Sequence, residues 1–257
     1  MKHLISLNDL SQKEIFDILT VAQELKEENK KGIKHHILEG KTLGMIFAKS
    51  STRTRVSFEV GMYQLGGHAL FLSSNDIQLG RGECIYDTAN VLSRYLDGIM
   101  IRTFSHNDVL ELAKYGQIPI INALTDYLHP CQVLADLLTI KEHKGTLKGL
   151  KLAYLGDGNN MANSLLYGCT KVGMDISVAT PKKYCCPNEV VENAKNTAAE
   201  TGSAVVITED AKEAVKGADV VYTDTWVSMG QEDQKAEKIK LFGDYQVNKE
   251  LFSYAKE

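Results

Sequence analysis

The sequence predicts an α/β fold of two Rossmann-like domains, each a parallel sheet flanked by helices. First, short apolar segments rich in Ile, Val and Leu alternate with longer amphipathic segments along the 257 residues, as in β-α-β units. Second, this alternation stops at the polar, glycine-containing segment 144–149 and then starts again. Third, polar residues of chemical interest follow predicted strands, where parallel sheets bind ligands. We therefore expect one domain over residues 1–146 and a second over 147–257.

A capping box marks the start of the first predicted helix. Ser11 can accept a hydrogen bond from the backbone of the first turn, and Glu14 can reach back to the Ser11 N–H. Apolar residues then recur at helical spacing from Ile15, so the helix is expected to reach about Lys30.

Four strand–helix units are expected in the first domain. The strands are short and apolar, and the segments between them carry apolar residues three and four positions apart. The last helix begins at a proline, which suits a first helical turn. The expected strands are Thr42–Ala48, Ala69–Leu72, Gly98–Arg102 and Pro119–Asn122; the expected helices are Thr52–Leu65, Tyr86–Leu96, Asp108–Tyr115 and Pro130–His143.

The second domain repeats the same alternation. Its strands again read as continuous apolar runs, which is typical of strands buried on both faces. The expected strands are Lys151–Leu155, Ile176–Ala179, Ala204–Ile207 and Val220–Thr223; the expected helices are Asn160–Val172, Asn188–Thr201 and Asp210–Lys216, with a further helical pattern over Val247–Ala255.

Composition excludes several classes of protein. The chain is 44% apolar and 24% charged, with a net charge of −4, so we expect neither nucleic-acid nor membrane partners. No apolar run reaches the roughly 18 residues that span a bilayer. The five cysteines are an odd, scattered set, which favours a cytoplasmic location. Cys185 and Cys186 are adjacent without a second CxxC pair, so no zinc site is expected.

The polar loop Lys49–Arg55 follows the first strand and leads into a helix. A helix N-terminus offers unpaired N–H groups and a partial positive charge. The hydroxyls of this loop add donors, and Arg53 adds a fork that matches a phosphate. An oxyanion site is therefore expected, although the nucleotide motif GxxxxGK[ST] is absent. From the residues alone, a Ser/Thr helix cap followed by solvated arginines explains the loop equally well.

The glycines Gly156 and Gly158 follow the fifth strand and suggest a dinucleotide-binding turn. That fingerprint requires a third glycine where Met161 stands, and a ribose-binding acid about 20 residues later. Asp175 precedes its strand instead of following it. A nicotinamide site is therefore a weak alternative.

His129 and Cys131 flank Pro130 and invite comparison with a Cys–His nucleophile. We reject that interpretation because Cys131 is expected to point to another face of the helix. Gln132 lies three residues after His129 and shares its side of the helix. A lone histidine is more often structural than catalytic.

Five motifs, in order and at matching spacing, resemble the aspartate/ornithine carbamoyltransferase family over essentially the whole chain. No single motif is specific, but five in register make chance very improbable. They are Ser51–Arg55, Asp76–Gly80 with Arg102 beyond it, His129–Gln132, Asp157–Asn160 and Asp224–Gly230.

The resemblance implies a binding site for carbamoyl phosphate. Arg102, His129 and Thr54 would bind the carbonyl oxygen and form an oxyanion hole, and Gln132 would hold the carbamoyl NH₂. Without the family, Arg102 could equally be a surface strand end. The complete implied set is Ser51, Thr52, Arg53, Thr54, Gln78, Arg102, His129 and Gln132.

The resemblance also implies L-ornithine as the amine acceptor. Asn160 would contact its α-amino-acid end, Asp224 would face an ammonium, and Ser228 with Met229 would complete the cradle. From the residues alone, Asp224 could be an acidic turn around a buried Trp226. A carbamoyltransferase for another amine such as putrescine, or a catalytically silent binding subunit, remains an alternative.

The mechanism implied by the resemblance is direct transfer, giving L-citrulline and phosphate. Arg102, His129, Thr54 and Arg53 are the expected catalytic residues, and no cofactor or metal is expected. Positioning and electrostatics would supply the rate. The same chemistry serves either direction of arginine metabolism.

Two further expectations concern assembly and length. Gln78 would reach carbamoyl phosphate in a neighbouring subunit, which requires a closed homo-oligomer such as a trimer. Family members continue beyond the position of Glu257 through a His-Cys-Leu-Pro strand end, a late arginine and a closing helix. We therefore expect a C-terminally incomplete second domain and poor turnover by this chain.

Overall fold

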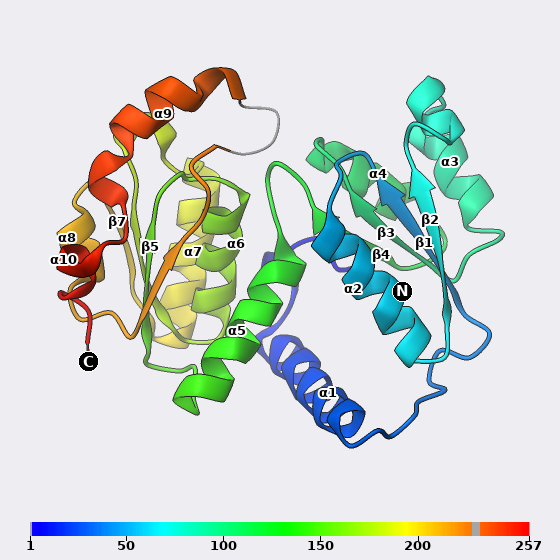
Figure 1. The fold of residues 1–257 in the computed structure, drawn as a ribbon, viewed down its shortest axis with the longest axis horizontal. Helices are drawn as coiled ribbons and strands as arrows, with labels where there is room; N and C mark the ends of the chain where they lie inside the picture. The colour runs from blue at the N-terminus through cyan, green and yellow to red at the C-terminus, as the bar shows by residue number, and fades with distance from the viewer. Residues whose placement is uncertain (1, 228–231, 257) are drawn as a thin grey trace. The chain divides into compact units, whose positions relative to one another are not determined.

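A computed structural model describes residues 2–227 and 232–256 (Figure 1). Its contacts divide the chain into two compact units, one formed by residues 1–9 and 17–131 and the other by residues 10–16 and 132–257. The expected domain boundary between residues 146 and 147 stays a prediction. No helix among the described residues is both long and apolar enough to cross a membrane.

The first unit contains a four-stranded parallel sheet in the order β2-β1-β3-β4. The N-terminal segment extends it, because Leu4 forms an isolated parallel bridge with Ile121. The strands are β1 (Thr42–Phe47), β2 (His68–Ser73), β3 (Gly98–Arg102) and β4 (Ile120–Leu124), and the helices are α1 (Gln12–Lys30, which continues from the other unit), α2 (Thr52–Gln64), α3 (Ile85–Leu92) and α4 (His106–Tyr115).

Alternating side chains of β1 pack on opposite faces of this sheet. Met45 and Phe47 join a cluster with Met62 of α2, whereas Ile46 joins a cluster with Val109 and other residues of α3 and α4. Because successive strand residues point to opposite faces, helices cover both sides of the sheet.

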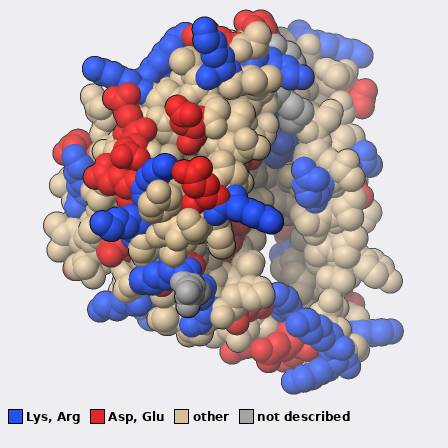
Figure 2. Space-filling view, turned by 60° about the vertical axis from the view of Figure 1, so that its left-hand side comes forward, with Lys and Arg blue, Asp and Glu red and all other residues tan. Residues whose placement is uncertain are grey.

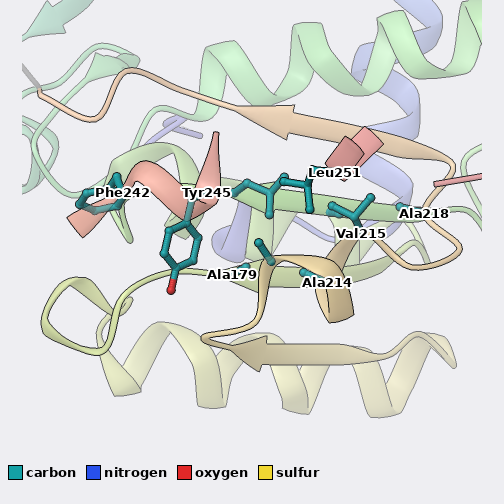
Figure 3. Close-up of a cluster of buried hydrophobic side chains, with 10 residues drawn as sticks. Ala179, Ala214, Val215, Ala218, Phe242, Tyr245 and Leu251 are labelled. Carbon is teal, nitrogen blue, oxygen red and sulfur yellow. The ribbon is translucent and has the colours of Figure 1, made fainter. Parts of the chain in front are cut away.

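The second unit contains a parallel sheet in the order β7-β6-β5-β8. One face packs on α8, on α10 and on the segment that follows α9, through a cluster that includes Ala179, Val215, Phe242 and Leu251 (Figure 3). The strands are β5 (Lys151–Leu155), β6 (Asp175–Ala179), β7 (Val205–Thr208) and β8 (Val220–Thr223), and the helices are α5 (Pro130–Lys144), α6 (Asn160–Lys171), α7 (Asn188–Thr201), α8 (Ala211–Val215), α9 (Lys235–Leu241) and α10 (Lys249–Phe252).

The two-sheet α/β fold is confirmed, and the strand ends lie within two residues of those expected. The capping box is also present, with Ser11 N–H donating to Glu14 at 2.8 Å and Glu14 N–H to the Ser11 hydroxyl at 3.3 Å. Three helices differ. The helix expected over Tyr86–Leu96 ends at Leu92, the helix expected over Val247–Ala255 is only Lys249–Phe252, and α9 was not expected.

In each sheet the strand that comes first in the chain is an internal strand, and later strands pair with both of its edges. In the first sheet β1 lies between β2 and β3, and in the second β5 lies between β6 and β8. The chain therefore first adds strands on one side of β1 or β5 and then crosses over to add strands on the other side. Such switch points are where open α/β sheets bind ligands, so both are candidate sites.

Candidate active site

The loop after β1 places hydroxyl groups at the N-terminus of α2. Ser51 caps this helix in an extended conformation, and its Oγ accepts a hydrogen bond from Thr54 N–H at 3.2 Å. The two hydroxyl oxygens lie 3.1 Å apart. Thr52 and Arg53, the first two helical residues, are exposed. The helix end therefore combines backbone donors, hydroxyls and the exposed guanidinium of Arg53, groups that can bind an anion.

Arg102 ends β3 and lies beside this helix end. Its Nη1 is 3.4 Å from Thr54 Oγ1, and its carbonyl accepts hydrogen bonds from Ala48 N–H at 2.9 Å and Lys49 N–H at 3.4 Å. Arg102 is only 7% exposed, and its buried Nε has no hydrogen-bond partner among the described residues. The arginine therefore organises the loop while keeping a donor unused.

The charge on Arg102 is poorly compensated. Burial lowers the pKa of this guanidinium, and the neighbouring charge of Arg53 lowers it further. An arginine stays protonated under all ordinary conditions, so the positive charges of Arg53 and Arg102 repel each other. A bound anion would relieve both the repulsion and the lost hydration.

Arg55 follows the same motif but is engaged elsewhere. Its Nε donates to Glu59 at 2.9 Å, and its guanidinium lies 3.7 Å from the centroid of the Phe71 ring. A cation over an aromatic face and an ion pair one helical turn away are both structural interactions. The structure thus separates the two arginines of the motif.

His129 directly precedes α5 and is partly buried. Burial lowers the pKa of its imidazole to about 4, and the charge of Arg102 contributes in the same direction. The ring is therefore neutral near pH 7 and keeps one N–H donor. A neutral donor close to Arg102 suits stabilisation of a developing oxyanion.

Cys131 is not an activated nucleophile. Its thiol donates to the Asn122 carbonyl at 3.4 Å, and burial raises its pKa to about 12. A thiolate is needed for nucleophilic attack. This geometry agrees with the rejection of a Cys–His pair.

Gln132 and Gln78 occupy different positions. Gln132 is the third residue of α5, and its Nε2 donates to Asp136 at 2.9 Å. Gln78 is exposed and begins a short 3-10 turn after β2. That turn is tight, because a Cβ on Gly80 would lie 2.0 Å from the Ser74 carbonyl oxygen. The described residues show no hydrogen bond from the Gln78 side chain to the Ser51–Arg102 group.

Lys49 was not among the residues predicted to form the site. It follows β1 directly, is 6% exposed, and forms an ion pair with Asp126. Its Nζ also lies 4.3 Å from the centroid of the Phe104 ring. A lysine in a polar loop is normally solvated, so only the folded packing identifies it as a buried charge in the loop that leads into α2.

The loops after β5 and β8 lie at the second candidate site, at the carboxyl ends of these neighbouring strands. Asn159 caps α6 by accepting from Met161 N–H at 2.9 Å, and its Nδ2 donates to Asp224 at 3.2 Å. Asn160 is the first residue of α6 and is partly exposed. Two of the residues expected to bind the acceptor, Asn160 and Asp224, therefore follow neighbouring strands. Ser228 and Met229 lie outside the described residues.

A buried ion pair holds the loop after β5. Lys238 of α9 lies 2.5 Å from Asp157, and Lys238 is 1% exposed. Gly158 permits the neighbouring turn, because a Cβ there would lie 2.3 Å from the Tyr184 carbonyl oxygen. The sequence signal for Asp157 was its place in the motif, whereas nothing marked Lys238.

In the part of the chain that the structure describes, the face drawn in Figure 2 carries no large surface of one charge that would suit a polyanion such as a nucleic acid. Basic and acidic side chains of the described residues are interspersed there rather than gathered by sign. This agrees with a small net charge of −4, and attraction of a large polyanion needs a single-sign field.

Family models match nearly the whole chain. Residues 2–142 match the carbamoyl-P binding domain of aspartate/ornithine carbamoyltransferase, and residues 148–257 match the Asp/Orn binding domain. The ornithine carbamoyltransferase of Carboxydothermus hydrogenoformans is 58% identical over 100% of this chain and 82% of that protein. That of Bacillus subtilis is 59% identical over 99% of this chain and 79% of that protein.

Solved structures show the same similarity. Ornithine carbamoyltransferase from Pyrococcus furiosus superposes with a TM-score of 0.96 at 54% identity, over 99% of this chain and 82% of that one. The anabolic ornithine carbamoyltransferase from Campylobacter jejuni gives 0.93 at 45% identity, over 100% and 84%. The chain belongs to the aspartate/ornithine carbamoyltransferase family.

Proposed function

We propose that the chain transfers the carbamoyl group of carbamoyl phosphate to the δ-amine of L-ornithine, giving L-citrulline and phosphate. The observation that carries the proposal is the buried Arg102 beside the hydroxyl-lined end of α2, with Arg53 nearby. Family membership supports the reaction class, and the relatives named above are ornithine carbamoyltransferases.

Carbamoyl phosphate is proposed to bind across the end of α2. The phosphate would accept hydrogen bonds from Ser51, Thr52 and the helix backbone, with Arg53 offsetting its charge. The carbonyl oxygen would face Thr54, Arg102 and the neutral His129, and the NH₂ group would donate to Gln132. These assignments rest on the two guanidiniums and on the Arg102 Nε, which has no hydrogen-bond partner among the described residues.

Ornithine is proposed to bind at the ends of β5 and β8. Asp224 would face a cationic amine, and Asn160 would hydrogen-bond the α-amino-acid end. Ser228 and Met229 are proposed to complete this subsite. Asp224 accepts a hydrogen bond from Asn159, and a carboxylate at this place supports an amine-bearing acceptor over a dicarboxylic one.

The proposed step is a direct acyl transfer. The uncharged δ-nitrogen attacks the carbonyl carbon, and the developing oxyanion is stabilised by Arg102, His129 and Thr54. The bond between that carbon and the phosphate oxygen then breaks. Phosphate leaves toward the end of α2 and takes up the proton lost from the amine. No covalent intermediate on the protein is required.

We also propose a homotrimer whose sites are shared between copies. The exposed side of α2 and β2 carries Val56, Val60, Tyr63 and Phe71, which are 37–81% exposed. Exposed apolar side chains clustered on neighbouring elements are typical of interfaces. Gln78 follows β2 and is itself exposed, so a neighbouring copy could receive it. A closed ring would satisfy this head-to-tail arrangement.

A cytoplasmic location and a role in arginine metabolism complete the proposal. All five cysteines are unpaired thiols in the structure, as is usual in a reducing compartment. A biosynthetic role is favoured because two of the relatives carry the word anabolic in their names.

Acceptor preference tests the proposal. Purified protein is incubated with carbamoyl phosphate and ornithine, putrescine or aspartate, and ureido product is measured by colour development. Because several relatives are longer than this chain, any longer form that its gene encodes is assayed in parallel. Ornithine should give the highest kcat/KM. A preference for putrescine would overturn the acceptor, and no ureido product from either form would overturn the reaction.

A further inference from the structure

Asp136 receives hydrogen bonds from two sides in the second unit. Its Oδ1 accepts from Gln132 Nε2 at 2.9 Å, one helical turn earlier on α5. Its Oδ2 accepts from the Tyr222 hydroxyl at 3.1 Å, on β8. Both oxygens of one partly buried carboxyl are therefore engaged by donors that lie 90 residues apart in the sequence.

A glutamine and an aspartate four residues apart are often only a surface pair on a helix. The Tyr222 contact distinguishes this pair. Burial raises the pKa of Asp136, and the hydrogen bonds from Gln132 and Tyr222 act in the opposite direction. Tyr222 in turn stacks on Tyr154 of β5, with ring centroids 6.1 Å apart. The carboxylate of Asp136 is thus anchored to the sheet through Tyr222, so its position does not depend on Gln132 alone.

The anchored carboxylate of Asp136 determines which end of the Gln132 amide, Nε2 or Oε1, points away from Asp136. A carboxylate accepts hydrogen bonds and repels another oxygen, so it binds the NH₂ end of the amide. The Oε1 end is then left for a second partner. The amide group of an unconstrained glutamine can rotate and exchange the positions of Oε1 and Nε2. A site that needs the oxygen as an acceptor binds its ligand more tightly when this rotation is already restricted.

We infer that Asp136 is a positioning residue for carbamoyl phosphate, which fixes the amide of Gln132 so that its Oε1 faces the carbamoyl NH₂ group. This inference rests on the proposed function, in which Gln132 receives that group. Asp136 itself touches no substrate. Its effect should therefore pass through Gln132 and should concern only ligands that carry an NH₂ group.

Two ligands separate this role from a structural one. Phosphonoacetamide carries a phosphonate and an amide NH₂, whereas inorganic phosphate lacks the amide. Binding of each is measured by calorimetry to the starting chain and to D136A, Q132A and the double variant. T139A is the matched control, because Thr139 is exposed on the same helix and, among the described residues, its hydroxyl donates to the Ala135 carbonyl of that helix at 2.9 Å.

The expected result is a selective, non-additive loss. D136A should weaken phosphonoacetamide binding roughly three- to tenfold, the size of one neutral hydrogen bond, and should leave phosphate binding unchanged. In the Q132A background, the same substitution should have no further effect. T139A should bind both ligands normally. If D136A unfolds early in a thermal melt, the near-isosteric D136N replaces it and should show the same selectivity at smaller size.

Other results would overturn the inference. Equal weakening of both ligands by D136A would mean a general structural role. Full additivity with Q132A would mean that Asp136 does not act through Gln132. Failure of the proposed function is visible separately, because the starting chain itself would then bind phosphonoacetamide no more tightly than phosphate.

Discussion

The ammonium of Lys238 lies 2.5 Å from the carboxylate of Asp157, with the two side chains only 1% and 9% exposed. Removing one partner of a buried ion pair leaves an uncompensated charge, which costs about 3–5 kcal/mol. K238M and D157N should therefore each lower the free energy of unfolding by roughly that amount. Urea unfolding can be followed through Trp226, the only tryptophan, which stacks on Phe242 at 5.9 Å.

The control for this prediction is an exposed ion pair that also involves α9. Glu237 pairs with Lys183, but these side chains are 49% and 62% exposed. Exposed pairs contribute at most about 1 kcal/mol, so K183A should shift the unfolding midpoint little. Equal losses for K183A and K238M would contradict the special role of the buried pair.

The pair Lys49–Asp126 should respond asymmetrically to substitution. The Lys49 side chain is 5% exposed and that of Asp126 is 62% exposed. D126A leaves a buried ammonium without its carboxylate and should cost about 1–3 kcal/mol, whereas K49M leaves a solvated carboxylate and should cost less than about 1 kcal/mol. Thermal or urea unfolding of both variants measures the difference. A larger loss for K49M would show that Lys49 contributes by packing or cation–π contact instead.

His129 should make the fold less stable as the pH falls. Its ordinary pKa of 6.5 drops to about 4 in the folded protein, so the unfolded chain takes up a proton first. The free energy of unfolding should thus decrease as the pH falls from 6.5 to about 4, by at most about 3 kcal/mol from this residue. Urea unfolding of the starting chain and H129Q at both ends of that window measures the contribution.

The two outcomes for His129 are distinct. H129Q should lose less stability over this pH window than the starting chain, and NMR titration of the ring should find the imidazole neutral at pH 6. A ring that titrates near pH 6.5 would remove the argument for a neutral donor next to Arg102.

Arg53 and Arg55 should have separable effects. Arg53 is exposed near Arg102, and R53A should weaken phosphate binding about tenfold, since charge-assisted hydrogen bonds contribute about 1.5–3 kcal/mol. Arg55 is engaged by Glu59 and Phe71, so R55A should retain phosphate affinity and lose a little stability instead. Calorimetry with phosphate and a thermal melt on each variant would decide. Equal loss of phosphate affinity would place both arginines in the anion site.

Strands were the most predictable part of the fold because buried parallel strands are uninterrupted apolar runs. α9 was missed because its pattern is inverted, with Lys238 buried and Ile239 51% exposed. A buried lysine whose partner lies on another element does not add to the pattern of apolar residues that predicts a helix. The helix starting at Ile85 ended earlier than expected because Ser93–Tyr95 form turns that apolar spacing does not reveal.

The candidate site was predictable where local chemistry sufficed. Ser51 and Thr54 were recognisable as a helix cap with donors, and Arg102 as the polar end of a buried strand. Lys49 and Asp136 were not, because their partners Asp126 and Tyr222 are distant in sequence and only the folded chain brings them together. Sequence motifs thus identify the groups proposed to contact ligand, whereas the residues that position those groups are identified only from the folded structure.

Isotope transfer tests the central claim most directly. Protein, in the 257-residue form and any longer form that the gene encodes, is incubated with ¹³C-labelled carbamoyl phosphate and unlabelled ornithine, and the products are analysed by mass spectrometry and NMR. The account predicts one labelled carbon at the ureido position of citrulline for each phosphate released. Phosphate release without labelled citrulline, from either form, would contradict carbamoyl transfer to ornithine.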